Sequence, residues 1–203
     1  SFIKGLQGPV GWHWHTKKFI PPAAYAAWIE DWLHQEWWKL WSSNDVNTLS
    51  DSVAFANQEV WFQSLMQAYR APSRHYHNLD HLVHGLSELG VWATNSGASA
   101  NEMRVLKQAF WFHDYVYGGQ QTISDEEASA QAWLNSSLDL PNAETVADLI
   151  RATDHFQAQH ISHPLKAILV GADLAILGQH VDVYDAYAAA IRCEYQDVPS
   201  SIY

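Results

Sequence analysis

Four side chains that commonly bind metal ions are spread over three separate segments of the chain. His81 closes one segment, His113 and Asp114 are adjacent in the second, and Asp173 lies in the third. Each lies in an otherwise apolar stretch with a helical pattern, where an unpaired polar side chain is costly. Imidazole and carboxylate groups together bind Zn, Mn, Fe or Mg, and a carboxylate can bridge two ions. One bound divalent cation would account for all four residues.

Each of these residues also has a structural explanation. A lone histidine such as His81 can be buried and hydrogen-bonded to a backbone carbonyl, and a histidine at a helix end is stabilised by the helix dipole. Asp173 stands among small and apolar residues, so its charge needs a partner. That partner is either a metal ion or a buried arginine, for example Arg104 or Arg151.

The composition narrows the classes of function. The chain has 203 residues, a formal net charge of −11 and only 11 Lys and Arg residues. A long nucleic acid or an anionic membrane surface needs a basic surface, so neither is expected as a partner. The single cysteine, Cys193, excludes an internal disulfide and fits a reducing compartment. With no signal peptide or apolar membrane span visible, we expect a cytoplasmic protein.

Helices must position the four residues, because apolar side chains recur at spacings of three and four from Pro21 onward. Two capping boxes, Ser99-x-x-Glu102 and Ser124-x-x-Glu127, open helices, and Gly118-Gly119 is predicted to end the first of these. The expected helices cover about 21–41, 50–69, a segment beginning near 77 or 78, 99–113, 124–134, 141–153, 164–177 and 181–195. The fold class is therefore all-α, with roughly eight helices.

The first 20 residues differ from the rest, since glycines and a proline interrupt any helical pattern there. They are interpreted as an N-terminal arm, a strand-like lead-in or an added segment that is not native. Residues 21–203 are expected to form a single helical domain.

The order His…His-Asp…Asp, on separate helices of an all-α chain, resembles the HD-domain superfamily of metal-dependent phosphohydrolases over roughly residues 70–195. The segment Tyr76-His77-Asn78-x-x-His81 also resembles the Tyr-His-Asn-x-x-His motif of cyclic-nucleotide phosphodiesterases, distant members of that superfamily. The runs 74–81, 111–114 and 172–178 are similar to a group of bacterial predicted HD phosphohydrolases. An HD-like helical bundle is the fold that this resemblance implies.

The resemblance also implies a role for each residue of the site. His81, His113, Asp114 and Asp173 would hold one divalent ion (Mn, Mg, Co, Zn, Ni or Fe), with Asp114 free to bridge to a second. A metal lowers the pKa of its bound water from 15.7 toward about 7, which gives hydroxide to attack phosphorus. His77 would protonate the leaving group or orient the phosphate.

Three further residues have less certain roles. Arg74 is a candidate phosphate clamp, because its planar fork suits phosphate oxygens, and a surface ion pair is an equal alternative. Glu126 and His155 occupy places comparable to second-metal ligands in some superfamily members. For Glu126, dipole stabilisation at a helix start is the preferred explanation. The usual acidic turn after His113-Asp114 is missing, with Gly118-Gly119 in its place.

The leading hypothesis is a metal-dependent hydrolase of a small phosphorylated metabolite, with nucleotides the expected class. The alternatives are an HD-fold di-iron oxygenase, which needs a nearly complete second set of ligands, and a non-catalytic nucleotide or metal sensor. The substrate, the metal, the number of ions and the oligomeric state, including a homodimer, stay open at this stage.

Overall fold

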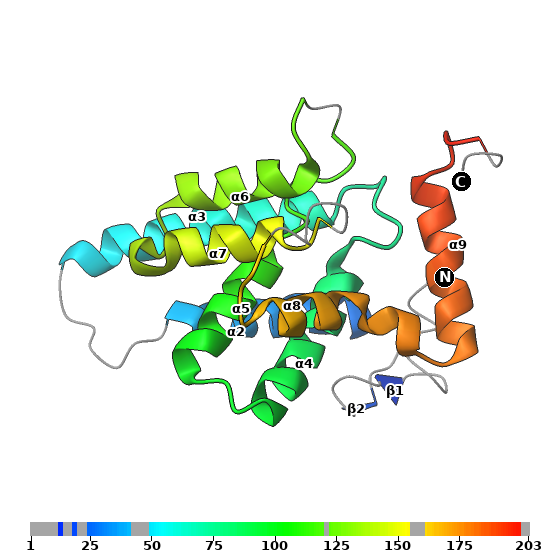
Figure 1. The fold of residues 1–203 in the computed structure, drawn as a ribbon, viewed down its shortest axis with the longest axis horizontal. Helices are drawn as coiled ribbons and strands as arrows, with labels where there is room; N and C mark the ends of the chain where they lie inside the picture. Colours follow the sequence, from blue (N-terminus) through cyan, green and yellow to red (C-terminus); the bar gives the residue numbers. More distant parts are fainter. Residues whose placement is uncertain are drawn as a thin grey trace.

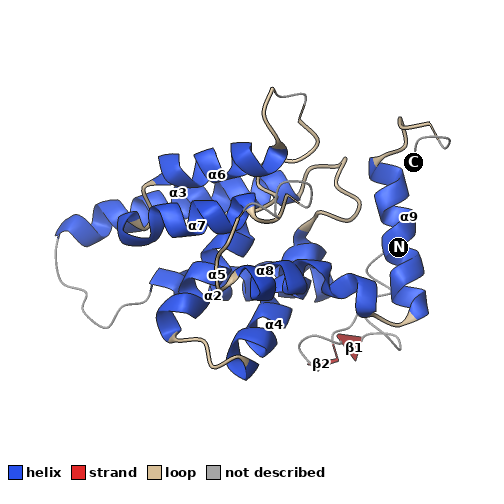
Figure 2. Ribbon diagram, viewed as in Figure 1, coloured by secondary structure: helices blue, strands red, loops and turns tan. Residues whose placement is uncertain are grey.

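The structure is a computed structural model that describes residues 12–13, 18–19, 24–41, 49–119, 122–154 and 161–199. Within these residues the fold is all-α, as predicted (Figures 1 and 2). The α-helices are α2 (Tyr25–Trp41), α3 (Leu49–Tyr69), α4 (Leu79–Asn95), α5 (Ala100–Phe112), α6 (Asp125–Ser136), α7 (Ala143–Arg151), α8 (Lys166–Asp173) and α9 (Val181–Glu194). Two 3₁₀ helices, η2 (Leu140–Asn142) and η4 (Leu174–Gly178), and an antiparallel pair of two-residue strands, β1 (Trp12–His13) and β2 (Lys18–Phe19), complete the described elements. The predicted arm, 1–20, otherwise lies outside the described residues.

Helix α5 is the centre of the bundle and packs against α2, α4, α6, α7 and α8. Its apolar residues from Val105 to Phe112 are buried, as the spacing of three and four predicts. Phe110 and Trp111 have no exposed surface. The end of α5 is therefore held rigidly among several helices, and His113 follows directly after it.

Helices α4 and α5 approach each other closely at a glycine. A Cβ atom at Gly85 would lie 1.8 Å from Cζ of Phe110, so only a residue without a side chain fits there. The Phe110 ring also lies against His81 and His113, at centroid distances of 5.5 and 4.5 Å. This contact sets the spacing between the two helices that carry the histidines.

Three helix starts agree with the sequence prediction. Ser99 and Glu102 form the expected capping box at α5, with both reciprocal hydrogen bonds present. Ser124 caps α6 through the backbone N–H of Glu127. Asn78 caps α4, where its side chain accepts a hydrogen bond from the amide of the second helical residue.

The end of α5 differs from the prediction. The helix stops at Phe112, close to the predicted last residue 113, but Gly118-Gly119, predicted to end it, does not form its cap. The guanidinium of Arg74 donates hydrogen bonds to the backbone carbonyls of Asp114 (2.7 Å) and Tyr115 (2.9 Å). In a continuing helix those carbonyls would accept from the amides four residues later, so Arg74 replaces the helical partners.

The backbone amides of Gly118 and Gly119, which would donate to these carbonyls in a continuing helix, bind a side chain instead. The N–H groups of Gly118 and Gly119 point to the carboxylate of Asp125, at 2.6 and 3.3 Å. Gly118 has a φ of +68°, a conformation that glycine adopts without strain. The segment after His113 is therefore an ordered turn, and it supplies Asp114 rather than extending the helix.

The predicted helix 164–177 is also divided. It is α-helical to Asp173 and then tightens into η4 before it turns into α9. Helix α9 stands at one edge of the molecule (Figure 1) and packs through a small apolar cluster of Tyr76, Ile176, Val183 and Ala190. No single described helix is long and apolar enough to cross a membrane; the bent pair 166–178 and 181–194 meets that test only jointly, across an angle of 106°.

Candidate metal centre

His81, His113 and Asp114 meet in a group that could hold a metal ion. Nε2 of His81 and Nε2 of His113 lie 3.1 Å apart. Oδ2 of Asp114 is 3.1 Å from Nε2 of His113 and 3.4 Å from Nε2 of His81. Both histidines are buried, with side chains 1% exposed, so the group faces inward. We call these residues, together with Asp173, the metal group.

Asp173 reaches the same point from the end of α8. Its Oδ1 lies 3.4 Å from Nε2 of His81 and 3.3 Å from Nε2 of His113. The alternative of a buried arginine partner does not hold, because Arg104 pairs with Asp139 and Arg151 pairs with Glu127 and Asp148. The structure thus brings together all four residues that the sequence selected.

The outer nitrogens of the two histidines are already engaged. Nδ1 of His113 lies 2.8 Å from the carbonyl of Phe110, which can only accept, so Nδ1 carries the proton. Nδ1 of His81 lies 3.2 Å from the hydroxyl of Tyr76. Because Nδ1 of His113 carries the proton, the lone pair of the neutral His113 ring is on Nε2, which points toward the centre of the metal group. Such an orientation by a second partner is usual for metal-binding histidines.

The charges of the metal group call for a cation at its centre. Burial works against charge on the imidazole of His113, yet the carboxylates of Asp114 and Asp173 hold its pKa well above the ordinary value. Burial likewise disfavours the ionised form of the two carboxylates. His113 and the other nearby imidazoles outweigh this effect and lower the pKa of both carboxyl groups. The two carboxylates thus place negative charge in a buried space, which a divalent ion would neutralise.

One buried atom in the metal group lacks a hydrogen bond. Oδ2 of Asp114 is inaccessible to solvent and has no hydrogen bond of acceptable geometry from the described residues, despite the two nearby imidazoles. A buried carboxylate oxygen without a partner is strongly unfavourable. Two imidazole nitrogens and two carboxylates, one of which provides this open oxygen, together fit the donor set of a Zn, Mn, Fe, Ni or Co ion.

His77 lies beside the metal group without belonging to it. Its Nε2 is 4.0 Å from Oδ2 of Asp114, and its Nδ1 is 2.7 Å from Oε2 of Glu194. The ring is bracketed by Tyr76 and Tyr117, at centroid distances of 4.8 and 4.2 Å. One nitrogen is thus fixed by a carboxylate and the other faces the metal group.

Glu194 is a partner of His77 that the sequence did not reveal. Its Oε1 accepts hydrogen bonds from the amides of Tyr76 (2.7 Å) and His77 (3.0 Å), and its Oε2 contacts the His77 ring and the Tyr117 hydroxyl (2.8 Å). Burial raises the pKa of this carboxyl, but His77 and the two amides outweigh burial and lower it from 4.5 to about 2. Glu194 is therefore an ionised carboxylate with a full set of donors.

Arg74, the candidate phosphate clamp, is buried and faces the backbone. Besides the carbonyls of Asp114 and Tyr115, it donates to the carbonyl of His77 at 3.2 Å. It forms no ion pair with a carboxylate of the described residues, so the alternative of a surface ion pair is wrong. Its contacts tie the segment that carries His77 to the segment that carries Asp114.

The residues considered for a second metal lie elsewhere or outside the description. Glu126 lines a hollow of about 360 Å³ with Glu127, Arg151 and Asp154, and no residue of the metal group borders that hollow. His155 lies outside the described residues. The described residues thus provide one metal group and no second set beside it.

Comparisons with models of known protein families, with curated proteins and with solved structures found no match. The resemblance to the HD-domain superfamily therefore rests on the sequence motifs and stays a prediction.

Proposed function

We propose that this chain is a metal-dependent phosphoric-ester hydrolase that acts on a small phosphorylated metabolite, with nucleotides the expected class. The observation that carries the proposal is the position of His77. It lies 4.0 Å from Asp114 of the metal group, with its far nitrogen bonded to an ionised carboxylate. A site that only stores a metal has no need of such a histidine beside its ligands.

The metal group supplies the electrophilic part of the reaction. A divalent ion held by His81, His113, Asp114 and Asp173 would activate water and polarise a phosphoryl oxygen. Helices α4 and α8 and the turn after α5 position these ligands, and the Gly85–Phe110 contact fixes the separation of α4 and α5. The site is thus preorganised, so little reorganisation is needed when the substrate binds.

His77 supplies the proton for the leaving oxygen. The Glu194 carboxylate accepts a hydrogen bond from Nδ1–H of His77. This bond orients the ring and leaves Nε2 directed toward the metal group. A general acid must present an N–H to the leaving oxygen, and in this orientation Nε2 is the ring nitrogen placed to do so. Glu194 acts through His77 and is a positioning residue.

Arg74 supports the same site by holding its two loops together. Its guanidinium donates hydrogen bonds to the backbone carbonyls of His77, Asp114 and Tyr115. We propose that Arg74 positions these residues through its backbone contacts.

The proposal is tested with metal-reconstituted protein. With Mn²⁺, Co²⁺ or Mg²⁺, we expect hydrolysis of p-nitrophenyl phosphate, of its diester or of nucleotides, and a chelator should abolish it. Asp114→Ala should lose both bound metal and activity, whereas Asp148→Asn, an exposed aspartate of α7, should keep both. Full activity of Asp114→Ala, or activity in excess chelator, would overturn the proposal.

The same measurements distinguish the two alternatives. Stoichiometric metal without hydrolysis of any ester indicates the non-catalytic sensor. Two iron ions per chain, with oxygen consumed on addition of a substrate, indicate the di-iron oxygenase. The second outcome requires ligands beyond the metal group, with Glu126 and His155 the first candidates.

A further inference from the structure

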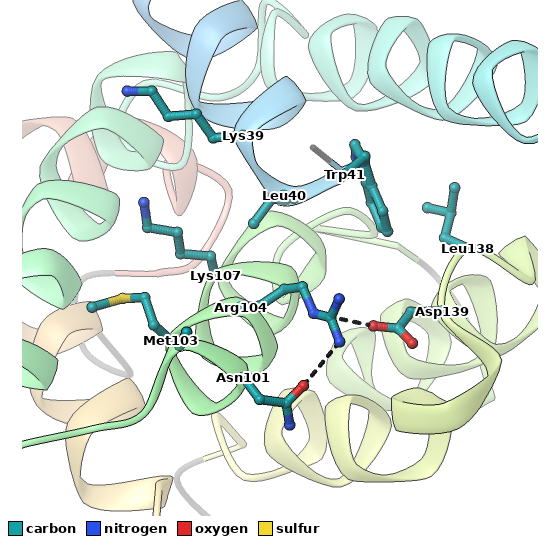
Figure 3. Close-up of a pocket in the computed structure, with 10 residues that line it drawn as sticks. Lys39, Leu40, Trp41, Asn101, Met103, Arg104, Lys107, Leu138 and Asp139 are labelled. Carbon is teal, nitrogen blue, oxygen red and sulfur yellow. Dashed lines mark hydrogen bonds and ion pairs between the residues drawn. The ribbon is translucent and has the colours of Figure 1, made fainter. Parts of the chain in front are cut away.

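A second hollow, of about 530 Å³, lies away from the metal group (Figure 3). The end of α2, the first turns of α5 and the segment that precedes η2 border it. Leu40, Trp41 and Leu138 provide apolar walls, and Arg104 and Lys107 provide charge. No residue of the metal group borders this hollow, which we call the α2–α5 pocket.

The α2–α5 pocket concentrates positive charge in an acidic protein. Three of the 11 Lys and Arg residues of the chain border it, namely Lys39, Arg104 and Lys107, although the net charge of the chain is −11. Glu36 neutralises part of this charge, since its two oxygens bind the two lysines at 2.6 and 2.7 Å. Asp139 is the second carboxylate near these three side chains. The three cations thus outnumber the two carboxylates, and a net charge of one positive unit remains.

Two N–H donors of the pocket have no acceptor among the described residues. They are Nε1 of Trp41 and Nε of Arg104, and both atoms are buried. Leaving a buried donor unpaired is unfavourable, so a group that supplies acceptors there is stabilised. Both residues border the pocket, one from α2 and one from α5.

Asp139 does not satisfy the arginine. Its Oδ2 lies 3.7 Å from Nε of Arg104, beyond hydrogen-bonding distance. The same oxygen accepts instead from Nε2 of Gln108 at 3.0 Å and from Nδ2 of Asn142 at 2.9 Å. Figure 3 shows Arg104 between Asp139 and Asn101, whose side-chain oxygen accepts from the guanidinium at 2.8 Å. Part of the guanidinium is thus left for another acceptor.

We propose that the α2–α5 pocket binds a small metabolite that carries an oxyanion, either a carboxylate or a phosphate. The fork of Arg104 matches two oxygens of either group, and Lys107 adds charge from the next turn of α5. Trp41 and Leu138 pack against the apolar part of the ligand. This site is separate from the proposed hydrolase centre and does not depend on it.

The test measures binding of inorganic phosphate and of succinate to the metal-free 203-residue chain by calorimetry at constant ionic strength. We expect saturable binding of at least one of them at one site per chain. Arg104→Gln should weaken it about tenfold or more, because a charge-assisted hydrogen bond is lost. The anion that binds more tightly identifies the phosphate or the carboxylate as the ligand group.

Matched variants separate this site from the metal group and from general charge. Lys107→Gln should also weaken binding, whereas Lys166→Gln, on α8, removes a cation outside the pocket and should leave binding unchanged. Asp114→Asn alters the metal group and should not affect binding. Absence of saturable binding to the wild-type chain overturns the proposal. So does binding that survives in folded Arg104→Gln and Lys107→Gln but changes in Asp114→Asn.

Discussion

The carboxylate of Glu194 lies 2.7 Å from Nδ1 of His77, although 117 residues separate the two in the sequence. The last residue of α9 thus reaches the segment just before α4. There its carboxylate also accepts hydrogen bonds from the backbone amides of Tyr76 and His77. The contact joins the edge helix to the segment that carries His77.

Glu194→Gln should lower turnover by roughly 10–100-fold while bound metal is unchanged, because it perturbs a partner of the reacting group. The amide that replaces one carboxylate oxygen donates, and it would face donors at His77 and Tyr117. If the role is to position a proton donor, the loss should be larger for alkyl or nucleoside esters than for p-nitrophenyl esters. Tyr117→Phe, which removes one hydrogen bond to Glu194, is the milder control. An equal loss for all leaving groups would contradict this role.

The same carboxyl predicts a pH dependence of stability. Its pKa is lowered from 4.5 to about 2 in the folded chain, so its stabilisation is complete above about pH 4.5 and is lost as the pH falls toward 2. The shift corresponds to at most about 3 kcal/mol. Urea unfolding of the wild type and of Glu194→Gln should give free energies that converge over this range. A difference that stays constant with pH would assign the contribution to packing instead.

Replacement of His77 and replacement of His81 should have different effects, although only four positions separate them in the sequence. His77 precedes α4, and His81 lies in its first turn. His81→Ala should lower metal content, and it should lower the melting temperature of metal-loaded protein because metal binding adds to stability. His77→Ala should keep its metal and melting temperature but lose about 10²–10⁴-fold in turnover. Metal analysis and thermal unfolding of both variants decide this. Metal lost in His77→Ala and retained in His81→Ala would reverse the two assignments.

Two glycines of α4 form a matched pair for the helix contact. Gly85→Ala places a methyl group against the buried ring of Phe110 and should destabilise the fold by roughly 1–3 kcal/mol. Gly90→Ala meets no atom within 4 Å and should stabilise the helix, by up to about 1 kcal/mol. Denaturant unfolding measures both. Metal affinity should fall in Gly85→Ala alone, because Phe110 also contacts the two histidine ligands.

The predictable parts of the fold were those set by local chemistry. Ser99-x-x-Glu102 contains both halves of its cap within one turn, so the start of α5 followed from the sequence. The four ligands were also predictable, because a charged or imidazole group in an apolar helix needs a partner, and few partners satisfy all four at once.

Long-range contacts account for what the sequence did not predict. The stop of α5 at Phe112 depends on Arg74, which takes the carbonyls that a longer helix would use. Glu194 has neighbours typical of a solvated helix end, Cys193 and Tyr195, and no spacing marks it as buried. For Arg74 the sequence shows a residue type suited to binding phosphate. It does not show the backbone carbonyls that the side chain contacts in the structure.

The position of Glu194 at the end of an edge helix separates two properties of the site. The proposed metal ligands belong to α4, to α8 and to the turn after α5. The partner of His77 lies on α9, whose apolar contact is a small cluster. Elements with few apolar contacts are the first to detach in native-state fluctuations. Detachment of α9 would leave a chain that still retains its ion but cannot protonate a leaving group. Catalytic competence would then be lost at a milder perturbation than metal retention, through a partly opened native form.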